Sequence, residues 1–339
     1  RIGNIFVGFT FDKKPIYARD LNAQGAMTIL LKDAIKPNLV QTIEGTPAII
    51  HGGPFANIAQ GTNTVVATKM GLSTAPYVVT EAGFGADLGA EKFLDIKCVD
   101  ANLKPDAVVI VATIKALKYH GGKSLDTLKE SDPAAVRKGL PNLEKHIENI
   151  ESFGLPVLVT INRYTTDSED EISAVKSFCE SKNVRFEICD VWGEGGSGAT
   201  ALAEELRELM EKEPSRFKPL YERTDSPKTK IEKLCKNYYG ADDVEYSAQA
   251  QKDLKRISDL GLDNLPICMA KTQSSISDNP KLLGRPEGFD FHIREIEIAA
   301  GAGFIIPIAG SMMRMPGLPA TPAAEGMDID KDGKITGLS

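Results

Sequence analysis

The chain has 339 residues, a formal net charge of -7 and a pI near 5.4, with 42% hydrophobic and 26% charged residues. This length predicts two or three domains rather than one core, and the composition excludes a disordered chain. The acidic charge excludes a nucleic-acid backbone as partner. Neither a bilayer-spanning apolar run nor a secretory signal is present, so we expect a cytoplasmic protein that binds no membrane.

Short apolar runs rich in β-branched residues alternate with longer amphipathic stretches along most of the chain. This order is typical of parallel strands joined by crossover helices, so it predicts an α/β fold with mostly parallel sheets. The expected strands cover residues 5–9, 77–80, 107–113, 157–161 and 184–188. The expected helices cover residues 21–34, 57–70, 143–153, 170–181, 199–213 and 249–259.

The composition changes twice along the chain, which predicts three domains. A polar stretch with a proline at residues 221–230 separates the α/β units from the C-terminal part of the chain. From residue 280, glycine- and proline-rich segments with short apolar runs predict loops and small strands. We therefore expect domains at residues 1–140, 141–230 and 231–339, the last a smaller α+β domain.

The string HGGPFANIA, at residues 51–59, comes after an apolar run and precedes a helical pattern. Gly52 and Gly53 can turn backbone amides toward the helix start, where an anion binds. A tight turn without a ligand explains the same spacing. His51 is then either a ligand contact or a hydrogen-bonded structural side chain.

A second glycine-rich string, GFGADLGAEKF at residues 83–93, comes after an expected strand. Its Gly-x-Gly-x-x-x-Gly spacing departs from a dinucleotide-binding loop. Asp87 either coordinates Mg²⁺ or caps the next helix. From the sequence alone, the cap is the more frequent arrangement.

The string VATIKALKYHGG, at residues 111–122, leaves an expected strand and places Lys115, Lys118 and His120 beyond its carboxyl end. Open α/β sheets bind ligands at that edge. The alternative is a solvated basic loop.

Two more strand-to-helix junctions each carry one aromatic residue. Tyr164 lies in INRYTTDSEDE at residues 161–171, and Trp192, the single tryptophan, lies in VWGEGGSGATA at residues 191–201. A flat heteroaromatic ligand can stack between two such rings. By base frequency alone, rings that cover the edge of the core are more common.

The C-terminal string DIDKDGKITGLS, at residues 328–339, matches only the first half of a calcium loop, because Ser339 replaces the glutamate needed at the twelfth position. We expect a hairpin turn around residues 331–333 instead. The five cysteines are scattered without metal-ligand spacing, which predicts buried thiols.

Taken together, these strings resemble the formate–tetrahydrofolate ligase family. The resemblance runs from RDLNAQGAMTILLKDAIKPNLVQTIEGTPAIIHGGPFANIA at residues 19–59 to GLPATPAAEGMDIDKDGKITGL at residues 317–338. VATIKALKYHGG is similar to a signature string of that family. PICMAKTQSSISD at residues 266–278 and AGSMMRMPGLP at residues 309–319 are similar to others.

The resemblance implies a ligase of one-carbon metabolism that joins formate to tetrahydrofolate with ATP, through formyl phosphate, to give 10-formyltetrahydrofolate. It implies ATP with Mg²⁺, leaves room for a monovalent cation, and implies a homotetramer. Residues 1–140 would then belong to a P-loop NTPase-like nucleotide-binding domain, and residues 141–230 would bind folate.

The resemblance also implies roles for single residues. Tyr164 and Trp192 stand where the family sandwiches its folate rings, so this interpretation outweighs the core-edge alternative. The other folate-pocket residues are Asn162, Asp167 and Ile188. The residues implied in catalysis are Phe84, Asp87 and Lys115. Those on the nucleotide and phosphate side are His51, Gly52, Gly53, Asn57, Gly83 and Gly85.

The chain also departs from the family. No GxxxxGK[ST] phosphate loop occurs in these residues, so we expect that loop in a missing N-terminal segment or a separate subunit. Gln60 stands where the family usually has His, Tyr164 where Phe is common, and Lys115 where it usually has Arg, which loses a planar bidentate fork. Glu194 stands where Lys is common, which reverses a charge.

These departures keep one alternative open, a non-catalytic folate- or nucleotide-binding subunit of the same family. A nicotinamide dehydrogenase is a more distant alternative. It is disfavoured because the GxGxxG fingerprint and the acidic residue beyond it are missing.

Overall fold

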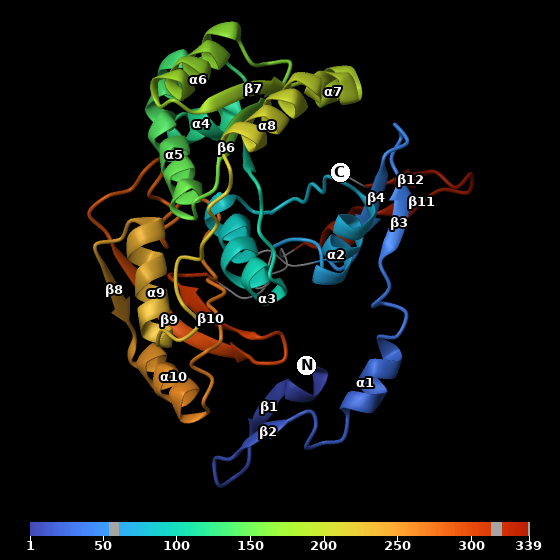
Figure 1. Cartoon of the computed structure of the whole chain (residues 1–339), viewed down its shortest axis with the longest axis vertical. Helices are drawn as coiled ribbons and strands as arrows, with labels where there is room; N and C mark the ends of the chain where they lie inside the picture. Colours follow the sequence, from blue (N-terminus) through green and yellow to red (C-terminus); the bar gives the residue numbers. More distant parts are fainter. Residues whose placement is uncertain (54–60, 313–320, 338–339) are drawn as a thin grey trace.

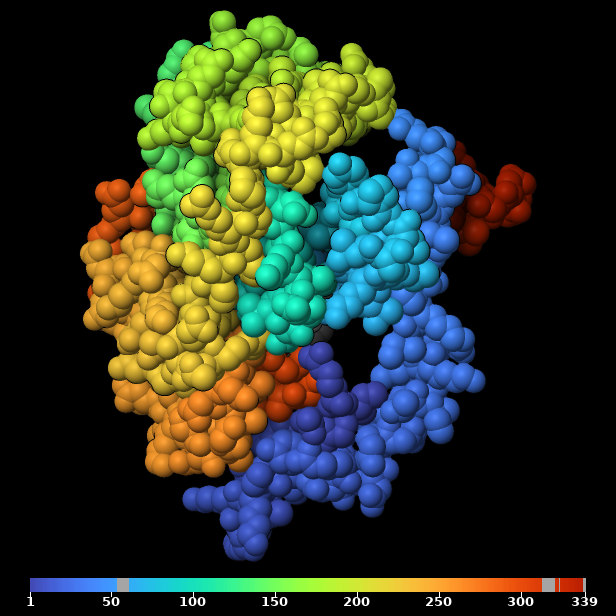
Figure 2. All heavy atoms as spheres, viewed as in Figure 1, coloured from blue at the N-terminus to red at the C-terminus, as the bar shows by residue number. Residues whose placement is uncertain are grey.

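The computed structural model describes residues 1–53, 61–312 and 321–337. Two three-stranded sheets with their helices form the body of this part of the chain, and an N-terminal arm runs along one side of it (Figure 1). In the space-filling view, open space separates part of this arm from the body (Figure 2). The α/β class expected from the alternating pattern is confirmed.

The first sheet is the parallel unit that the sequence predicts. Its strands are β5 (Val108–Ala112), β6 (Val157–Asn162) and β7 (Arg185–Cys189), in that order. Ala112 lies opposite Ile161, which lies opposite Ile188, so the strands end together at one edge. The central strand β6 is buried nearly throughout, as its apolar, β-branched run predicts.

Crossover helices connect these strands, also as expected. The connections are α4 (Ile114–His120), η4 (Leu125–Thr127) and α5 (Pro133–Ser152) between β5 and β6, and α6 (Glu169–Ser181) between β6 and β7. After β7 come α7 (Val191–Glu194), η5 (Gly195–Ala199) and α8 (Thr200–Lys212). The helices expected at residues 170–181 and 199–213 are therefore confirmed.

Local capping explains where two of these helices begin. Ser168 and Glu171 form a capping box at the start of α6. The helix expected at residues 143–153 begins earlier, at Pro133, because the Asp132 side chain accepts from the Ala135 amide at 2.9 Å. The helix continues past Pro141, although proline inside a helix usually kinks or ends it.

The second sheet has the order β10–β9–β8, with β9 antiparallel to β10 and parallel to β8. Its strands are β8 (Asp243–Tyr246), β9 (Asp290–Ala299) and β10 (Phe304–Ala309). Its helices are α9 (Pro227–Lys233), η6 (Leu234–Tyr239) and α10 (Ala248–Asp259). The expectation of only small strands after residue 280 is wrong for β9, which alternates exposed and buried positions along much of its ten residues.

The N-terminal arm consists of short, locally paired elements. They are η1 (Ile2–Asn4), β1 (Phe6–Phe9), β2 (Pro15–Tyr17), α1 (Gln24–Leu30), β3 (Asn38–Gln41), β4 (Pro47–Ile50) and α2 (Val65–Thr74). β1 confirms the strand expected at residues 5–9, but it pairs antiparallel with β2 rather than in a parallel sheet. The helix expected at residues 21–34 is shortened to α1. The helix expected at residues 57–70 is shifted to α2, with residues 57–60 outside the described ranges.

The strand expected at residues 77–80 is wrong, since this segment is irregular and pairs with no strand of the described ranges. Tyr77 and Val79 are largely exposed there. The apolar run matched the residue pattern of a strand, but its backbone forms no strand pairing with the described residues.

The next segment is helical, and the C-terminus forms a small hairpin. The helical segment consists of two wide π-helical turns, η2 (Ala86–Ala90) and η3 (Phe93–Cys98), followed by the short α-helix α3 (Val99–Ala101). After η7 (Ala323–Gly326), β11 (Asp328–Ile329) pairs antiparallel with β12 (Ile335–Thr336). Gly333, with φ near +81°, lies in the turn, so the expected hairpin is confirmed.

One hydrophobic cluster joins the two sheets. It contains Leu117 and Val159 from the first sheet region and Tyr238 and Phe291 from the second. The domain boundaries after residues 140 and 230 stay predictions, and each falls within a helix, α5 and α9 respectively. The five cysteines are free and four are buried. No helix in the described ranges has the length and apolar character to cross a membrane.

Candidate functional site

The glycine-rich loop at residues 83–89 crosses another chain segment at very short range. The Gly83 amide donates to the Gly61 carbonyl at 2.9 Å, and a Cβ added to Gly61 would lie 2.9 Å from the Gly89 Cα. Between Gly83 and Gly89, Phe84 has φ near +68° and is 51% exposed. A non-glycine residue in this region is strained, which is typical of functional loops.

Asp87 lies inside the protein and pairs with a lysine from far along the chain. The Lys271 ammonium lies 2.5 Å from Asp87 Oδ2, and both side chains are buried. Lys271 also donates to the carbonyls of Thr272, at 3.0 Å, and Ser275. The expected helix cap is wrong, because Gly85 is the N-cap of η2 and the Asp87 side chain makes no cap bond.

This ion pair also bears on the magnesium alternative for Asp87. A carboxylate oxygen held by a buried ammonium is already neutralised and leaves little charge for a cation. In the described ranges, no group of three or more His, Cys, Asp or Glu residues is arranged to hold a metal ion. The Asp87 carboxylate therefore does not fit a Mg²⁺ ligand in this arrangement.

Two carboxyl groups that sequence reasoning missed lie buried beside this loop. Burial and the neighbouring Asp95 carboxyl raise the pKa of Glu91 well above its usual value. Burial raises the pKa of Asp95 to about 7, although Asp95 accepts from the Leu220 amide at 2.8 Å. The available signal was the spacing of four residues between Glu91 and Asp95, which places both on one face of a helical segment.

His51 has the structural role that the sequence left open. Its Nε2 donates to the Ala34 carbonyl at 3.0 Å, and its Nδ1 lies 2.7 Å from the Thr64 hydroxyl. Gly52 has φ near +70°, and a Cβ added there would lie 2.8 Å from Thr64 Cγ2. These contacts favour the tight-turn alternative. Asn57 and Gln60 lie outside the described residues.

The carboxyl edge of the parallel sheet brings two of the candidate loops together. Lys115, in the first turn of α4, places its ammonium 4.1 Å from the centroid of the Tyr164 ring. This is within cation–π range. Tyr164 is 41% exposed, so it remains open to solvent at this edge.

Lys118 is not part of a solvated basic loop, so that alternative is wrong for it. Its ammonium is buried, lies 2.8 Å from Glu171 and donates to the Glu130 carbonyl at 2.9 Å. Glu171 also accepts from the Asp132 and Ser168 amides at 2.8 and 2.9 Å. The loops beyond β5 and β6 are thereby held together.

Asp167 fixes the backbone of the Tyr164 loop. Its Oδ2 accepts from the Tyr164 amide at 2.9 Å, and its own amide donates to the Tyr164 carbonyl at 3.0 Å. Burial raises the pKa of Asp167. Asn162 ends β6 opposite Cys189, and the half-buried Ile188 packs against the main core.

Trp192 lies on the short helix α7, just beyond the neighbouring strand. It is 79% exposed, so it does not cover the core. No ring contact joins Trp192 to Tyr164, both of which the structure describes. Glu194 ends α7 and is exposed, and the Glu44 carboxylate from the β3–β4 turn accepts from the Gly196 amide at 2.5 Å.

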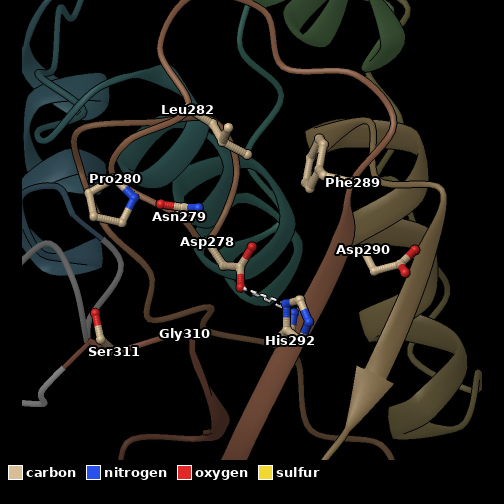
Figure 3. A pocket seen from close by; sticks show the side chains of 9 residues that line it. All are labelled: Asp278, Asn279, Pro280, Leu282, Phe289, Asp290, His292, Gly310 and Ser311. Carbon is tan, nitrogen blue, oxygen red and sulfur yellow. Dashed lines mark hydrogen bonds and ion pairs between the residues drawn. The ribbon is translucent and has the colours of Figure 1, made fainter.

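A cavity of about 370 Å³ lies elsewhere, beside the second sheet (Figure 3). His292 lies at its wall, with Nδ1 3.2 Å from Asp278 and Nε2 3.1 Å from Glu245. None of the candidate residues named from the sequence lines this cavity.

The comparison with protein families agrees with the strings that the sequence presents. The family model described as formate–tetrahydrofolate ligase matches residues 1–339. That match covers both sheets, the glycine loop and the edge that carries Lys115, Tyr164 and Trp192. The chain belongs to the formate–tetrahydrofolate ligase family.

Proposed function

We propose that this chain takes part in the ATP-dependent ligation of formate to tetrahydrofolate, giving 10-formyltetrahydrofolate through formyl phosphate. Family membership supports the reaction class. The observation that carries the proposal is the carboxyl edge of the β5–β6–β7 sheet, where exposed Tyr164 and Trp192 lie just beyond adjacent strands. Ligands of open α/β sheets bind at such an edge.

The pterin ring would stack on Tyr164 and Trp192, with Asn162, Asp167 and Ile188 shaping the base of the pocket. The fixed backbone between Tyr164 and Asp167 supports this assignment, since a held loop orients a ring without ordering it on binding. The missing contact between the two rings is compatible with a ligand between them, because stacked centroids lie about 4.5–7 Å apart for each pair.

The reaction proceeds in two steps. A formate oxygen attacks the γ-phosphorus of ATP and ADP leaves, giving formyl phosphate. The N10 amine of tetrahydrofolate then attacks the formyl carbon, phosphate leaves, and the amine loses a proton. Catalysis of both steps rests on positioning and on charge stabilisation.

In this proposal the strained glycine loop, with Phe84, Gly83 and Gly85, faces the nucleotide and formyl phosphate side, and His51, Gly52 and Gly53 are assigned to the same side. Asp87 supports that loop through Lys271. Mg²⁺ bound to ATP supplies charge neutralisation of the phosphates. We assign none of the described residues to that ion, nor to a monovalent cation.

The phosphates of ATP need a cradle of backbone amides and a lysine, and no GxxxxGK[ST] string occurs in the 339 residues. We propose that the reaction uses such a loop from a further segment of the polypeptide or from a separate chain. We further propose a cytoplasmic homotetramer, in line with the family.

A non-catalytic folate-binding subunit is the second candidate. The commitment of Asp87 to an internal ion pair favours it, since that carboxylate is then not free for chemistry.

Formation of 10-formyltetrahydrofolate and ADP from ATP, formate and tetrahydrofolate tests the proposal. We expect no formate-dependent ADP from the chain alone and turnover once the P-loop-bearing part is supplied. Tetrahydrofolate binding without turnover, even with that part present, would favour the non-catalytic subunit. Ordinary turnover by the chain alone would contradict the need for a further phosphate loop.

A further inference from the structure

Helix α4 is fixed in place at the open edge of the parallel sheet. Lys118 is fully buried and tied to Glu171 and the Glu130 carbonyl. Lys115 lies three residues earlier on the same helix, half-buried at the mouth of the sheet. The Lys118 anchor therefore sets the position from which the Lys115 side chain extends.

The Tyr164 backbone is fixed as well. Two hydrogen bonds between Tyr164 and Asp167 hold the main chain, at 2.9 and 3.0 Å. The ring extends from this loop with 41% of the residue exposed. Beyond the loop, it meets the Lys115 ammonium, 4.1 Å from the ring centroid.

We propose that Lys115 is a positioning residue for the folate stack, holding the Tyr164 ring by a cation–π contact on one face while the opposite face receives the pterin. This inference rests on the proposed function, since it concerns the same stack. An ammonium bound to one face limits the rotamers of the ring before ligand arrives, so less conformational entropy is lost on binding.

In this role Lys115 acts on the Tyr164 ring and not on the phosphates of the nucleotide. A lysine that served only as a positive charge near an anionic ligand would act equally well without the Tyr164 ring. A lysine that positions the ring loses its effect when the ring is removed. The two roles therefore differ in a double-mutant cycle.

Tetrahydrofolate affinity, measured by calorimetry and by Trp192 emission, tests this on the full chain. We expect Lys115→Met to weaken tetrahydrofolate binding about two- to fivefold, because an exposed cation–π contact contributes about that much to affinity. Lys115→Arg should keep the contact and therefore the affinity. In a Tyr164→Leu background, Lys115→Met should produce no further loss. Lys104→Met is the charge-matched control, since this exposed lysine precedes β5 at the opposite end of the sheet.

The outcomes separate this inference from the function on which it rests. No binding by the unmodified chain would overturn both. Binding that is equal in the unmodified chain and Lys115→Met, or an equal loss from Lys115→Met with and without the Tyr164 ring, would overturn the positioning role alone. Melting temperatures recorded for every variant show whether a loss of binding comes from unfolding.

Discussion

The Asp87 carboxylate and the Lys271 ammonium lie 2.5 Å apart inside the protein, although 184 residues separate them in the chain. The pair joins the strained glycine loop to the segment PICMAKTQSSISD of the second sheet region. Lys271 is fully buried and is further held by the Thr272 and Ser275 carbonyls. A loop on the proposed nucleotide side thus depends on a residue from the C-terminal part of the chain.

Breaking this pair should destabilise the whole chain. We expect Lys271→Met to lower the free energy of unfolding by about 3–5 kcal/mol, because it leaves the Asp87 carboxylate buried without its partner. Urea denaturation measures the change.

Replacing both partners provides the control. The double variant Asp87→Leu with Lys271→Met should recover most of that loss, since two apolar side chains need no partner. Lys255→Met, which breaks the exposed Lys255–Asp259 pair, should change stability little. A Lys271→Met variant as stable as the unmodified chain would show that the pair does not hold the loop.

The raised pKa of Asp95 predicts how the free energy of unfolding depends on pH. Burial raises its pKa in the folded chain from 3.8 to about 7, so the folded state keeps a proton that the unfolded state releases. Its stabilising contribution is full below its unfolded pKa, near 3.8, falls as pH rises, and is lost above about 7. The raised pKa of Glu91 acts in the same direction.

The test compares urea midpoints at a pH below the folded pKa of Asp95 and at a pH above it. The unmodified chain should unfold at lower urea at the higher pH, and Asp95→Asn should reduce this difference. Asparagine is suited to the test because it does not titrate and its oxygen still accepts from the Leu220 amide. The same pH difference in both proteins would assign the titration to other groups.

The spacing of apolar residues correctly predicted the strands and helices that short sequence patterns define. Residues 157–161 form a near-continuous apolar run and became the central strand β6, and residues 170–181 became α6 behind a capping box. The strand-to-helix junctions predicted to carry Tyr164 and Trp192 are confirmed, and parallel register brings the ends of β6 and β7 to the same edge of the sheet.

Pairings between distant segments could not be predicted from the sequence. Nothing local to Asp87 indicates Lys271, and the position of Lys118 in a basic string gave no sign of its burial against Glu171. The apolar run at residues 77–80 met the strand pattern but found no partner strand in the described ranges. In each case tertiary packing, rather than local propensity, decided the outcome.

Trp192 should matter for binding but not for folding. It is 79% exposed, so Trp192→Ala should leave the free energy of unfolding almost unchanged. Tetrahydrofolate binding should weaken by about 1–3 kcal/mol, from lost stacking and lost apolar burial. Calorimetry measures the affinity of both forms. Unchanged affinity, together with an unquenched Trp192 in the unmodified chain at saturating tetrahydrofolate, would remove this residue from the site.

Glu194 stands where Lys is common in the family, and this change of charge should affect folate binding. It is exposed at the end of α7, in the loop where the Glu44 carboxylate already accepts from the Gly196 amide. The Glu194 carboxylate, with the Glu44 carboxylate that contacts this loop from the β3–β4 turn, should repel the anionic glutamate tail of a folate. At a separation of about 6 Å and an effective dielectric near 40, one such like-charge pair costs on the order of 1 kcal/mol before salt screening.

We therefore expect Glu194→Lys to tighten tetrahydrofolate binding several-fold at low ionic strength, and more for polyglutamyl forms. Raising the salt concentration should shrink the gain, because exposed charges are screened. Glu194→Gln separates loss of repulsion from new attraction and should give an intermediate affinity. Titrations with mono- and polyglutamyl tetrahydrofolate at two salt concentrations measure these effects. Equal affinities for Glu194→Lys and the unmodified chain under all four conditions would mean that the folate tail does not pass this loop.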